Sequence, residues 1–479
     1  MTGRPLLRAL SALSLHKIGQ ITGALAFAVL VPRSLGPELF GQLSFVLALS
    51  LLLHMVGDLG SLDIMGRFVP GWAQEGAAGR RRIGGLVWQL TWARLGLGVL
   101  ITLALVGGGE WLAPWLGPGR AALVGLGVAL RLLSWAPYHL SFGLNRMGRW
   151  AVELSWRQWA MIPCLLVGRR WGLDGLLVGL VMAEAVFLAP GVFWLRPYGR
   201  PPRPAWAALR PYVRFGLGFF LANVLVVLLY RSGPVLLEVL TRDTVAVGYL
   251  GLALSLYMLL ITIIGQYLTA FVPSLALLTT RGQMTEARRR LERVIHHATL
   301  AMGALLLGLG LLIEPLAPLL FGPDFGPVGR LFLLLSLALP LQPLVSAGRG
   351  AAAAFGRPRV ALAAMTVGLA VGLAAGLLLI PAYAATGAGL ALVLGVLATA
   401  VTLLRVGRDW LRPPWRSVAL AALPLVLVFL PSPPSLPAAL ALMAPALAVY
   451  LLVLLLGRGL TPTELWRWVP FRNDSGRSP

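Results

Sequence analysis

The sequence predicts an all-α integral membrane protein with about 14 transmembrane helices. Of its 479 residues, 58% are hydrophobic and only 12% are charged, whereas a soluble globular protein carries about 25% charged residues. The apolar residues form runs of about 20, the length at which a helix crosses a hydrocarbon layer of ~30 Å. Runs such as residues 43–55 lack the alternating pattern of a barrel strand, so helices are favoured over a β-barrel.

Short segments that are polar or contain proline and glycine separate the apolar runs and mark the boundaries of the predicted spans. Gly36-Pro37 separates the first two spans, the arginines at 80–82 precede the third, and Gly117-Pro118 precedes the fourth. The thirteenth span is short and contains Pro424. The expected spans are 13–32, 41–66, 83–108, 120–143, 150–168, 173–195, 211–231, 245–272, 294–320, 327–350, 360–381, 384–404, 417–431 and 437–457.

The net charge of +23 alone would suggest a nucleic-acid partner, but the positions of the basic residues indicate a membrane topology instead. When the connections are numbered alternately, 29 of the 40 Lys and Arg residues fall on one side and seven on the other. Because basic loops stay in the cytoplasm, the chain is expected in a bacterial inner membrane with both termini on the cytoplasmic side. The basic loops could also bind anionic membrane lipids, and no nucleic-acid partner is expected.

The two halves of the chain resemble each other at an offset of about 204 residues, which indicates an internal duplication. Six short matches occur in the same order; one pairs Glu110-Trp-Leu-Ala-Pro-Trp-Leu116 with Glu314-Pro-Leu-Ala-Pro-Leu-Leu320. Six spans separate the copies, so both have the same orientation, and such parallel repeats build transporters with two lobes related by a pseudo-two-fold axis along the membrane normal. The expected parts are an N-terminal six-helix lobe (1–195), a basic cytoplasmic linker (196–210), a C-terminal six-helix lobe (211–404), and an extra helix pair with a cytoplasmic tail (405–479).

Four short segments resemble the polysaccharide and O-antigen flippases of the multidrug/oligosaccharidyl-lipid/polysaccharide exporter superfamily. They are Leu35-Gly-Pro-Glu-Leu-Phe-Gly41, Val247-Gly-Tyr249, Leu320-Phe-Gly-Pro-Asp-Phe325 and Ile380-Pro-Ala-Tyr-Ala-Ala-Thr-Gly-Ala-Gly-Leu-Ala391, in which Ala384 replaces a glycine of the family pattern. The resemblance implies that the chain moves undecaprenyl-pyrophosphate-linked oligosaccharide from the inner to the outer leaflet. It also implies glycosyltransferases or a polymerase of an envelope polysaccharide pathway as partners. These motifs are scaffold turns, so they specify the fold more strongly than the cargo.

Charged residues in the middle of the predicted spans are candidates for the transport path, because a charge at that depth costs about 2.5–3.5 kcal/mol and normally faces a cavity or a partner. Arg94 and Arg131 lie near the middle of the third and fourth spans, and Glu184 lies deep in the sixth. The functional interpretation is a cationic cavity for a pyrophosphate or an acidic sugar, with Glu184 as a proton-coupling group. The structural alternative is an internal salt bridge, such as Glu184 with Arg131, that only fixes helix packing.

A second group of charged residues gathers toward the cytoplasmic ends of the first, second and fifth spans. Glu153 and Arg157 are one helical turn apart and are expected to pair, and Asp58 could bridge to Lys17. The functional hypothesis is an inward-facing entrance that recognises the lipid pyrophosphate, with Lys17 and Arg67 as its ligands. The structural alternative is a set of salt bridges that gate the protein. This group consists of Lys17, Asp58, Asp63, Arg67, Glu153 and Arg157, and Pro70 and Pro273 are hinge candidates.

The sequence gives no sign of a metal site or of a bound cofactor. It has one cysteine, Cys164, and its only close histidine pair is adjacent, so the two do not share a helix face. Coupling to an H⁺ or Na⁺ gradient would supply the energy for transport. No external loop exceeds about a dozen residues, which argues against an enzyme with an external catalytic domain.

Two other functions remain open at this point. Within the same superfamily, the cargo could be lipid II or a cationic drug, although a drug exporter would favour acidic rather than basic cavity residues. From a different class, the chain could be a non-transporting scaffold of an envelope-synthesis complex.

Overall fold

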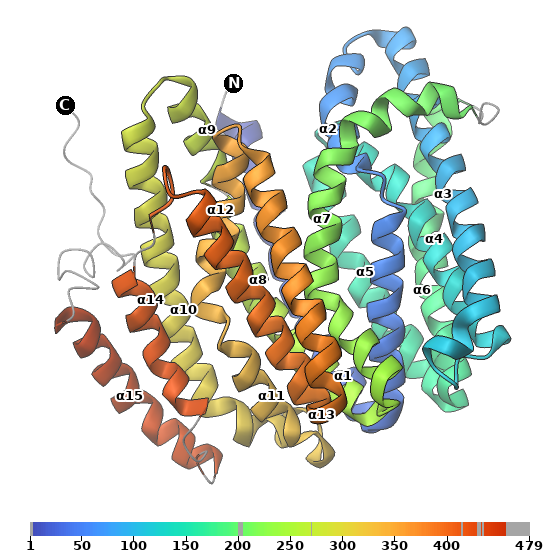
Figure 1. Ribbon diagram of the computed structural model, residues 1–479. Coiled ribbons are helices and arrows are strands. Elements are labelled where there is room, and N and C mark those ends of the chain that lie inside the picture. The colour runs from blue at the N-terminus through green and yellow to red at the C-terminus, as the bar shows by residue number, and fades with distance from the viewer. Residues whose placement is uncertain are drawn as a thin grey trace. The chain divides into compact units, whose positions relative to one another are not determined.

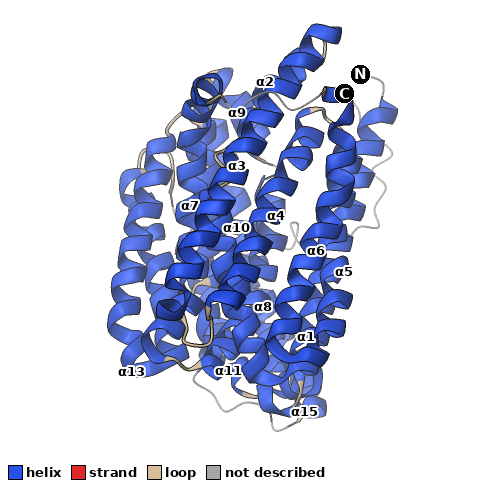
Figure 2. Cartoon of the chain, turned by 90° about the vertical axis from the view of Figure 1, so that its right-hand side faces the viewer, coloured by secondary structure: helices blue, strands red, loops and turns tan. Residues whose placement is uncertain are grey.

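The structure is a computed structural model that describes residues 3–199, 205–269, 271–412, 415–428, 433 and 435–456. Every regular element in these residues is helical (Figure 2). The side chains of residues 3–17, 147, 151–155, 218, 219, 266, 267, 269, 272, 273 and 276 are not described. The expectations for the side chains of Lys17, Glu153 and Pro273 therefore lie outside the described residues.

In the part of the chain that the structure describes, fifteen α-helices follow one another (Figure 1). Those up to the middle of the chain are α1 (Gly3–Val56), α2 (Ser61–Trp72), α3 (Gly76–Leu112), α4 (Pro118–Gly143), α5 (Met147–Gly168), α6 (Gly172–Leu195), α7 (Trp206–Thr241) and α8 (Thr244–Thr269). The remainder are α9 (Val272–Thr280), α10 (Met284–Phe321), α11 (Pro327–Ser336), α12 (Gln342–Ala354), α13 (Pro358–Val406), α14 (Trp415–Ala422) and α15 (Leu436–Leu456). Short 3₁₀ turns include η1 (Arg169–Trp171) and η2 (Arg196–Tyr198).

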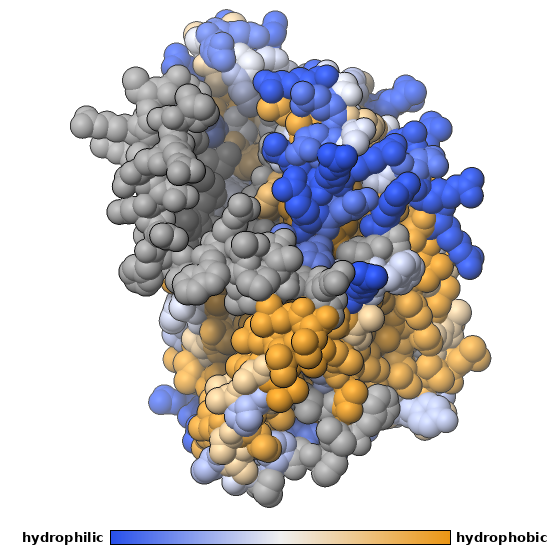
Figure 3. Space-filling model, turned by 90° about the vertical axis from the view of Figure 1, so that its left-hand side faces the viewer, coloured by the Kyte–Doolittle hydropathy of each residue, from blue (hydrophilic) through white to orange (hydrophobic). Residues whose placement is uncertain are grey.

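The prediction of an all-α membrane protein is confirmed. Among the described residues, ten helical segments are long and apolar enough to cross a membrane. Three of them, Ile18–Val56, Trp156–Tyr198 and Pro358–Val406, each overlap two predicted spans, and the thirteenth predicted span corresponds to the shorter apolar helix Trp415–Val426. The second predicted span, 41–66, was too long, because α1 ends at Val56 and α2 begins at Ser61. The surface in Figure 3 shows hydrophilic residues gathered at one end above an apolar expanse, as a bilayer requires.

Two of the long helices contain a sharp kink between two predicted spans. In α1 the backbone of Gly36 has φ 74° and ψ 170°, directly before Pro37. In α13 the backbone of Ala384 has φ 45° and ψ −125°, three residues after Pro381. A positive φ strains an L-residue and suits glycine, so the glycine that Ala384 replaces has a physical reason to stand at this position.

The predicted end of the seventh span was wrong. Helix α7 continues to Thr241, and its apolar segment is Phe220–Thr241, so Arg231 lies inside the span and not in an outer loop. The prediction ended the span at Arg231, three residues before Pro234. Pro234 instead lies within the helix, as prolines can in membrane helices when neighbouring groups satisfy the freed backbone.

Three of the four segments that resemble the flippase family, 35–41, 247–249 and 320–325, lie next to one another. The ring of Phe325, which is buried, lies edge-on to Phe40 and to Tyr249, with centroids 6.0 and 6.1 Å apart. A Cβ atom on Gly41 would lie 1.8 Å from the carbonyl oxygen of Thr244, and one on Gly248 would lie 2.5 Å from that of Pro37. The two glycines of the proposed repeat therefore let α1 and α8 approach each other closely.

The described chain separates into two compact units. Unit 1 comprises residues 1–259, 318–331 and 365–395, and unit 2 comprises 260–317, 332–364 and 396–479. A buried cluster of unit 1 joins α2 with α3 through residues such as Ile64, Val87 and Leu90. In unit 2, Tyr450 and Leu454 of α15 pack against Leu300 and Leu307 of α10. The division into two six-helix lobes stays a prediction.

Candidate functional site

A break between α1 and α2 in unit 1 places several polar groups inside the apolar part of the chain. Residues 57–60 leave the helix, with Leu59 and Gly60 at φ 56° and 67°. The broken turn exposes carbonyl oxygens that no longer have a helical partner. The fully buried Arg94 of α3 donates from its guanidinium to Gly57 O (3.4 Å), Asp58 O (3.1 Å), Asp58 Oδ1 (3.3 Å) and Ser61 Oγ.

Two histidines extend this polar network. The Nδ1 atom of buried His139 contacts Ser61 Oγ and lies 3.7 Å from Asp58 Oδ1. Trp135 lies next to both His139 and His54, at centroid distances of 4.6 and 4.7 Å. Neither ring nitrogen of the buried His54 has a hydrogen-bond partner among the described residues. Sequence reasoning missed both histidines, whose only signal was an isolated imidazole within an apolar run.

An aromatic cavity of about 140 Å³ adjoins His139. Its lining residues come from α2, α4, α5 and α6: Leu62, Trp135, Tyr138, His139, Trp150, Arg157 and Phe187. The phenol of Tyr138 donates to Phe187 O (2.8 Å), and the guanidinium carbon of Arg157 lies 5.9 Å from the Phe187 ring centroid. The cavity is therefore walled by aromatic rings, with one guanidinium at its edge.

Four charged residues form a second group, which we call the arginine cluster: Arg131, Arg157, Arg231 and Glu184. Arg157 Nη2 donates to Glu184 Oε1, and both side chains are mostly buried. Arg131 lies within electrostatic range of Arg157, Glu184 and Arg231, and it lines a small cavity together with Glu184. The Nε of Arg131 and the Oε2 of Glu184 are buried without a hydrogen-bond partner in the described part of the chain. The carboxylate of Glu184 thus pairs with Arg157 and interacts with Arg131, and Arg131 in turn lies within electrostatic range of Arg231.

The structure changes the pairing that the sequence suggested. The ion pair of Glu184 is with Arg157 and not with Arg131, and Asp58 pairs with Arg94. The expected pairs of Glu153 with Arg157 and of Asp58 with Lys17 involve side chains that are not described. Arg94 and Arg131, which looked equivalent in the sequence, therefore differ: the first is paired inside a helix break, whereas the second lies in the arginine cluster.

The other candidates of the cytoplasmic group lie on α2. Asp63 is half-buried near Asp58, close enough for the two carboxylates to interact. Arg67 and Pro70 are exposed, and Pro70 lies within the helix near its end. Over the described residues, no group of three or more His, Cys, Asp or Glu is placed to hold a metal ion.

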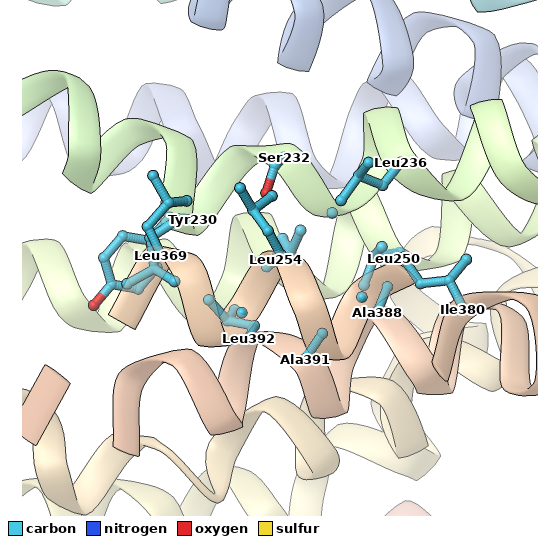
Figure 4. Close-up of a pocket in the computed structure, with 15 residues that line it drawn as sticks. Tyr230, Ser232, Leu236, Leu250, Leu254, Leu369, Ile380, Ala388, Ala391 and Leu392 are labelled. Atoms are coloured by element: carbon cyan, nitrogen blue, oxygen red, sulfur yellow. The ribbon is translucent and has the colours of Figure 1, made fainter. Parts of the chain in front are cut away.

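A further cavity in unit 1 is apolar and narrow. Side chains of α7, α8 and α13 line it (Figure 4), including Leu236, Leu250 and Ile380, with Tyr230 and Ser232 as its polar members. Its volume is about 20 Å³, enough for about one water molecule. It has no charged lining residue, so the arginine cluster is the stronger candidate for an anionic cargo.

Several arginines that the topology placed outside the membrane bind helix ends. Arg242 donates to Leu112 O (2.5 Å) and Trp111 O (2.9 Å) at the C-terminus of α3, and Arg33 donates to Leu319 O (3.4 Å) near that of α10. Arg120 pairs with Asp174 at 2.6 Å. Cations at helix C-termini satisfy free carbonyls and complement the helix dipole, so Arg242 and Arg33 have a structural reason to lie on the side with few basic residues. Arg120 has an acidic partner there instead.

Residues 6–279 match a protein family described as polysaccharide biosynthesis protein. No curated protein matches the chain.

Solved structures of transporters share the fold. The lipid II flippase MurJ in an inward closed conformation superposes with a TM-score of 0.73 at 12% identity, over 93% of this chain and 98% of that one. An inward-facing multidrug resistance MATE family transporter of the MOP superfamily gives a TM-score of 0.58 at 15% identity, over 84% of this chain and 97% of that one. A eukaryotic MATE transporter gives a TM-score of 0.52 at 15% identity, over 88% of this chain and 99% of that one. The resemblance seen in the sequence is confirmed, and the architecture is that of a MurJ- and MATE-like all-α transporter.

Proposed function

Because the chain belongs to the polysaccharide biosynthesis protein family, we propose that it is a flippase for undecaprenyl-pyrophosphate-linked oligosaccharide. It moves this cargo across the membrane by alternating access and catalyses no chemical reaction. Membership of the family supports a role in polysaccharide biosynthesis, and the fold shared with transporters supports movement of the cargo across the membrane.

The arginine cluster is the observation that carries the proposal. Three guanidinium groups and one carboxylate leave an excess of positive charge among membrane helices, where each unpaired charge costs about 2.5–3.5 kcal/mol on insertion scales. This unfavourable free energy indicates that an anion neutralises the unpaired guanidinium groups during function. A pyrophosphate fits, because guanidinium groups bind phosphate oxygens through two parallel hydrogen bonds.

Arg94 has a different place in the proposal. In this conformation it is fully buried and bound to Asp58 and Ser61, so it positions the α1–α2 break rather than contacting cargo. The broken turn in turn holds His139 at the wall of the aromatic cavity. We propose that the cargo enters past Lys17 and Arg67 at the cytoplasmic side. Asp58, Asp63 and Glu153 would then act in gating, with Pro70 and Pro273 as hinges.

Glu184 is proposed as the coupling residue. Its Oε1 accepts from Arg157, while its Oε2 is buried without a donor among the described residues. A proton on Oε2 would neutralise the carboxyl and release Arg157 toward the cargo. H⁺ is therefore the preferred coupling ion; Na⁺ would need further oxygen ligands beside Glu184.

The proposed location is a bacterial cytoplasmic membrane with both termini inside, because 29 of the 40 basic residues fall on that side in the sequence. Arg231 leaves the outer count, since it lies inside a span, and this strengthens the bias. Glycosyltransferases or a polymerase of an envelope polysaccharide pathway would supply or consume the cargo.

A reconstituted transport assay tests the proposal. Full-length protein in proteoliposomes is offered a fluorescent undecaprenyl-pyrophosphate-linked saccharide, a neutral glycolipid with the same lipid and sugar, and a cationic dye. The proposal expects flipping of the pyrophosphate-linked saccharide alone. Transport of the dye, or equal flipping of the neutral glycolipid, would overturn the assignment of an anionic cargo.

A further inference from the structure

A buried carboxylate near the end of α7 joins two segments of unit 1 that are far apart in the sequence. Glu238 is 1% exposed. Its Oε1 accepts from Trp115 Nε1 (2.8 Å), in the turn between α3 and α4, and its Oε2 accepts from Thr244 Oγ1 (3.2 Å), at the start of α8. Within the described residues, no Lys, Arg or His forms an ion pair with Glu238. Two neutral donors therefore hold this buried carboxylate in place.

Other contacts hold the same segments together. Arg242, directly after α7, donates to two carbonyl oxygens at the C-terminus of α3. The ring of Trp115 lies edge-on to Phe45 of α1, with centroids 5.4 Å apart. The backbone of Thr244 lies so close to Gly41 of α1 that a Cβ there would be 1.8 Å from its carbonyl oxygen. The hydrogen bonds of Glu238 thus lie where α1 and the end of α3 meet the turn between α7 and α8.

These contacts cross between the two copies of the internal repeat. Helix α1 and the α3–α4 turn belong to the predicted N-terminal lobe, 1–195, and α7 and α8 belong to the predicted C-terminal lobe, 211–404. In the predicted topology the connections 109–119 and 232–244 both lie on the outer side of the membrane. Glu238 therefore joins the outer ends of the two predicted lobes.

The chemistry of this contact suits segments that must also separate. A buried carboxylate depends on its hydrogen-bond donors, because the protein interior replaces the water that would hydrate it. Apolar side chains of the same shape would hold the segments together at least as well, since a polar pair contributes little beyond the hydration that it gives up. When the segments separate, water hydrates the carboxylate, whereas apolar side chains would expose apolar surface. The carboxylate therefore lowers the free energy of the separated form.

We propose that Trp115, Glu238 and Thr244 form an outer latch. The latch closes the outer ends of the two predicted lobes while cargo enters from the cytoplasmic side, and it separates when the cargo leaves. This inference rests on the alternating access of the proposed function. Glu238 acts by positioning α7 against the α3–α4 turn and does not bind the cargo.

Double electron–electron resonance of the full chain in nanodiscs, without cargo, tests the latch. Spin labels are attached at G119C, at the start of α4, and at L240C, near the end of α7, in a C164S background. Both label positions are exposed, and a Cβ on Gly119 meets no neighbour. Because no cargo is present, the result does not depend on what the protein transports. The unmodified latch should give one short distance.

Two variants should move this distance in opposite directions. W115F/T244V keeps the side-chain shapes but leaves the carboxylate without its donors. Because a hydrogen bond to a charged group shifts an equilibrium by at least about tenfold, the ratio of separated to closed forms should rise about tenfold or more. W115F/T244V/E238M also removes the charge and should restore the short distance. Should W115F/T244V fail to fold, T244V alone should shift the ratio in the same direction.

The matched control W88F/T402V removes an indole donor and a threonine hydroxyl that contact backbone carbonyls elsewhere, and it should leave the distance unchanged. An unchanged distance in W115F/T244V, even with a lower melting temperature, would overturn the proposal and leave a purely structural contact. Equal separation in the variant with E238M would also overturn it, because hydration of the carboxylate would then play no part. A latch that opens as expected in a protein that flips no pyrophosphate-linked saccharide would refute the proposed cargo and support the latch.

Discussion

Removing Arg94 should destabilise the protein strongly, because this side chain is the buried partner of a broken helix. In the Arg94→Met variant, the Asp58 carboxylate stays buried without its cation, which typically costs about 3–5 kcal/mol. The carbonyl oxygens of Gly57 and Asp58 lose their donor as well, and each unsatisfied buried group costs about 1–3 kcal/mol. At about 2 °C per kcal/mol for a large domain, the apparent melting temperature should fall by about 6–10 °C or more.

The assay is thermal unfolding of the detergent-solubilised full chain, followed by fluorescence-detected size exclusion. The exposed Arg170→Met is the matched control and should melt as the wild type does. The double variant R94M/D58N removes both charges and should recover part of the loss, because only the backbone carbonyls stay unsatisfied. A wild-type melting temperature for Arg94→Met would refute the structural role of Arg94 and return it to the list of cargo ligands.

Three further predictions follow from local geometry. Ala384→Gly should raise the free energy of unfolding by about 1 kcal/mol, since φ 45° strains alanine; an unchanged or lower melting temperature would contradict this. Gly41→Leu should prevent the close approach of α1 to Thr244 and abolish folding, measured as the yield of monodisperse protein, whereas Gly85→Leu, whose Cβ meets no neighbour, should fold normally. Glu184→Gln should make flipping independent of an imposed pH gradient; a gradient response equal to that of the wild type would exclude Glu184 as the proton carrier.

The membrane helices could be predicted from the sequence because each apolar run is long enough to cross the bilayer and is bounded by polar residues. Span boundaries were less predictable where a signal was ambiguous. The seventh span was predicted to end at Arg231, but α7 continues through Arg231 and Gly233-Pro234 to Thr241. In a membrane the alternative to a helix is unsatisfied backbone, so a proline or a charge often stays inside one.

The candidate site was predictable in its residue types but not in its pairs. Arg94, Arg131 and Glu184 stand out because charges are rare in apolar runs. Their partners depend on contacts across the fold: Arg157 meets Glu184 from a position 27 residues away, and Arg94 meets Asp58 from 36 residues away. His54 and His139 were missed because an isolated histidine in an apolar run gives no pattern to recognise, and His139 acquires its role only through Ser61 and Trp135.

Whether the arginine cluster binds the cargo is tested by the flipping rate of a pyrophosphate-linked saccharide by R131Q/R231Q in proteoliposomes. Each lost charge-assisted hydrogen bond is worth about 1.5–3 kcal/mol, so the rate should fall at least tenfold while abundance and melting temperature stay unchanged. The control Arg170→Gln removes an exposed charge and should flip normally. A wild-type rate in the double variant would show that the buried positive charge binds no anionic cargo.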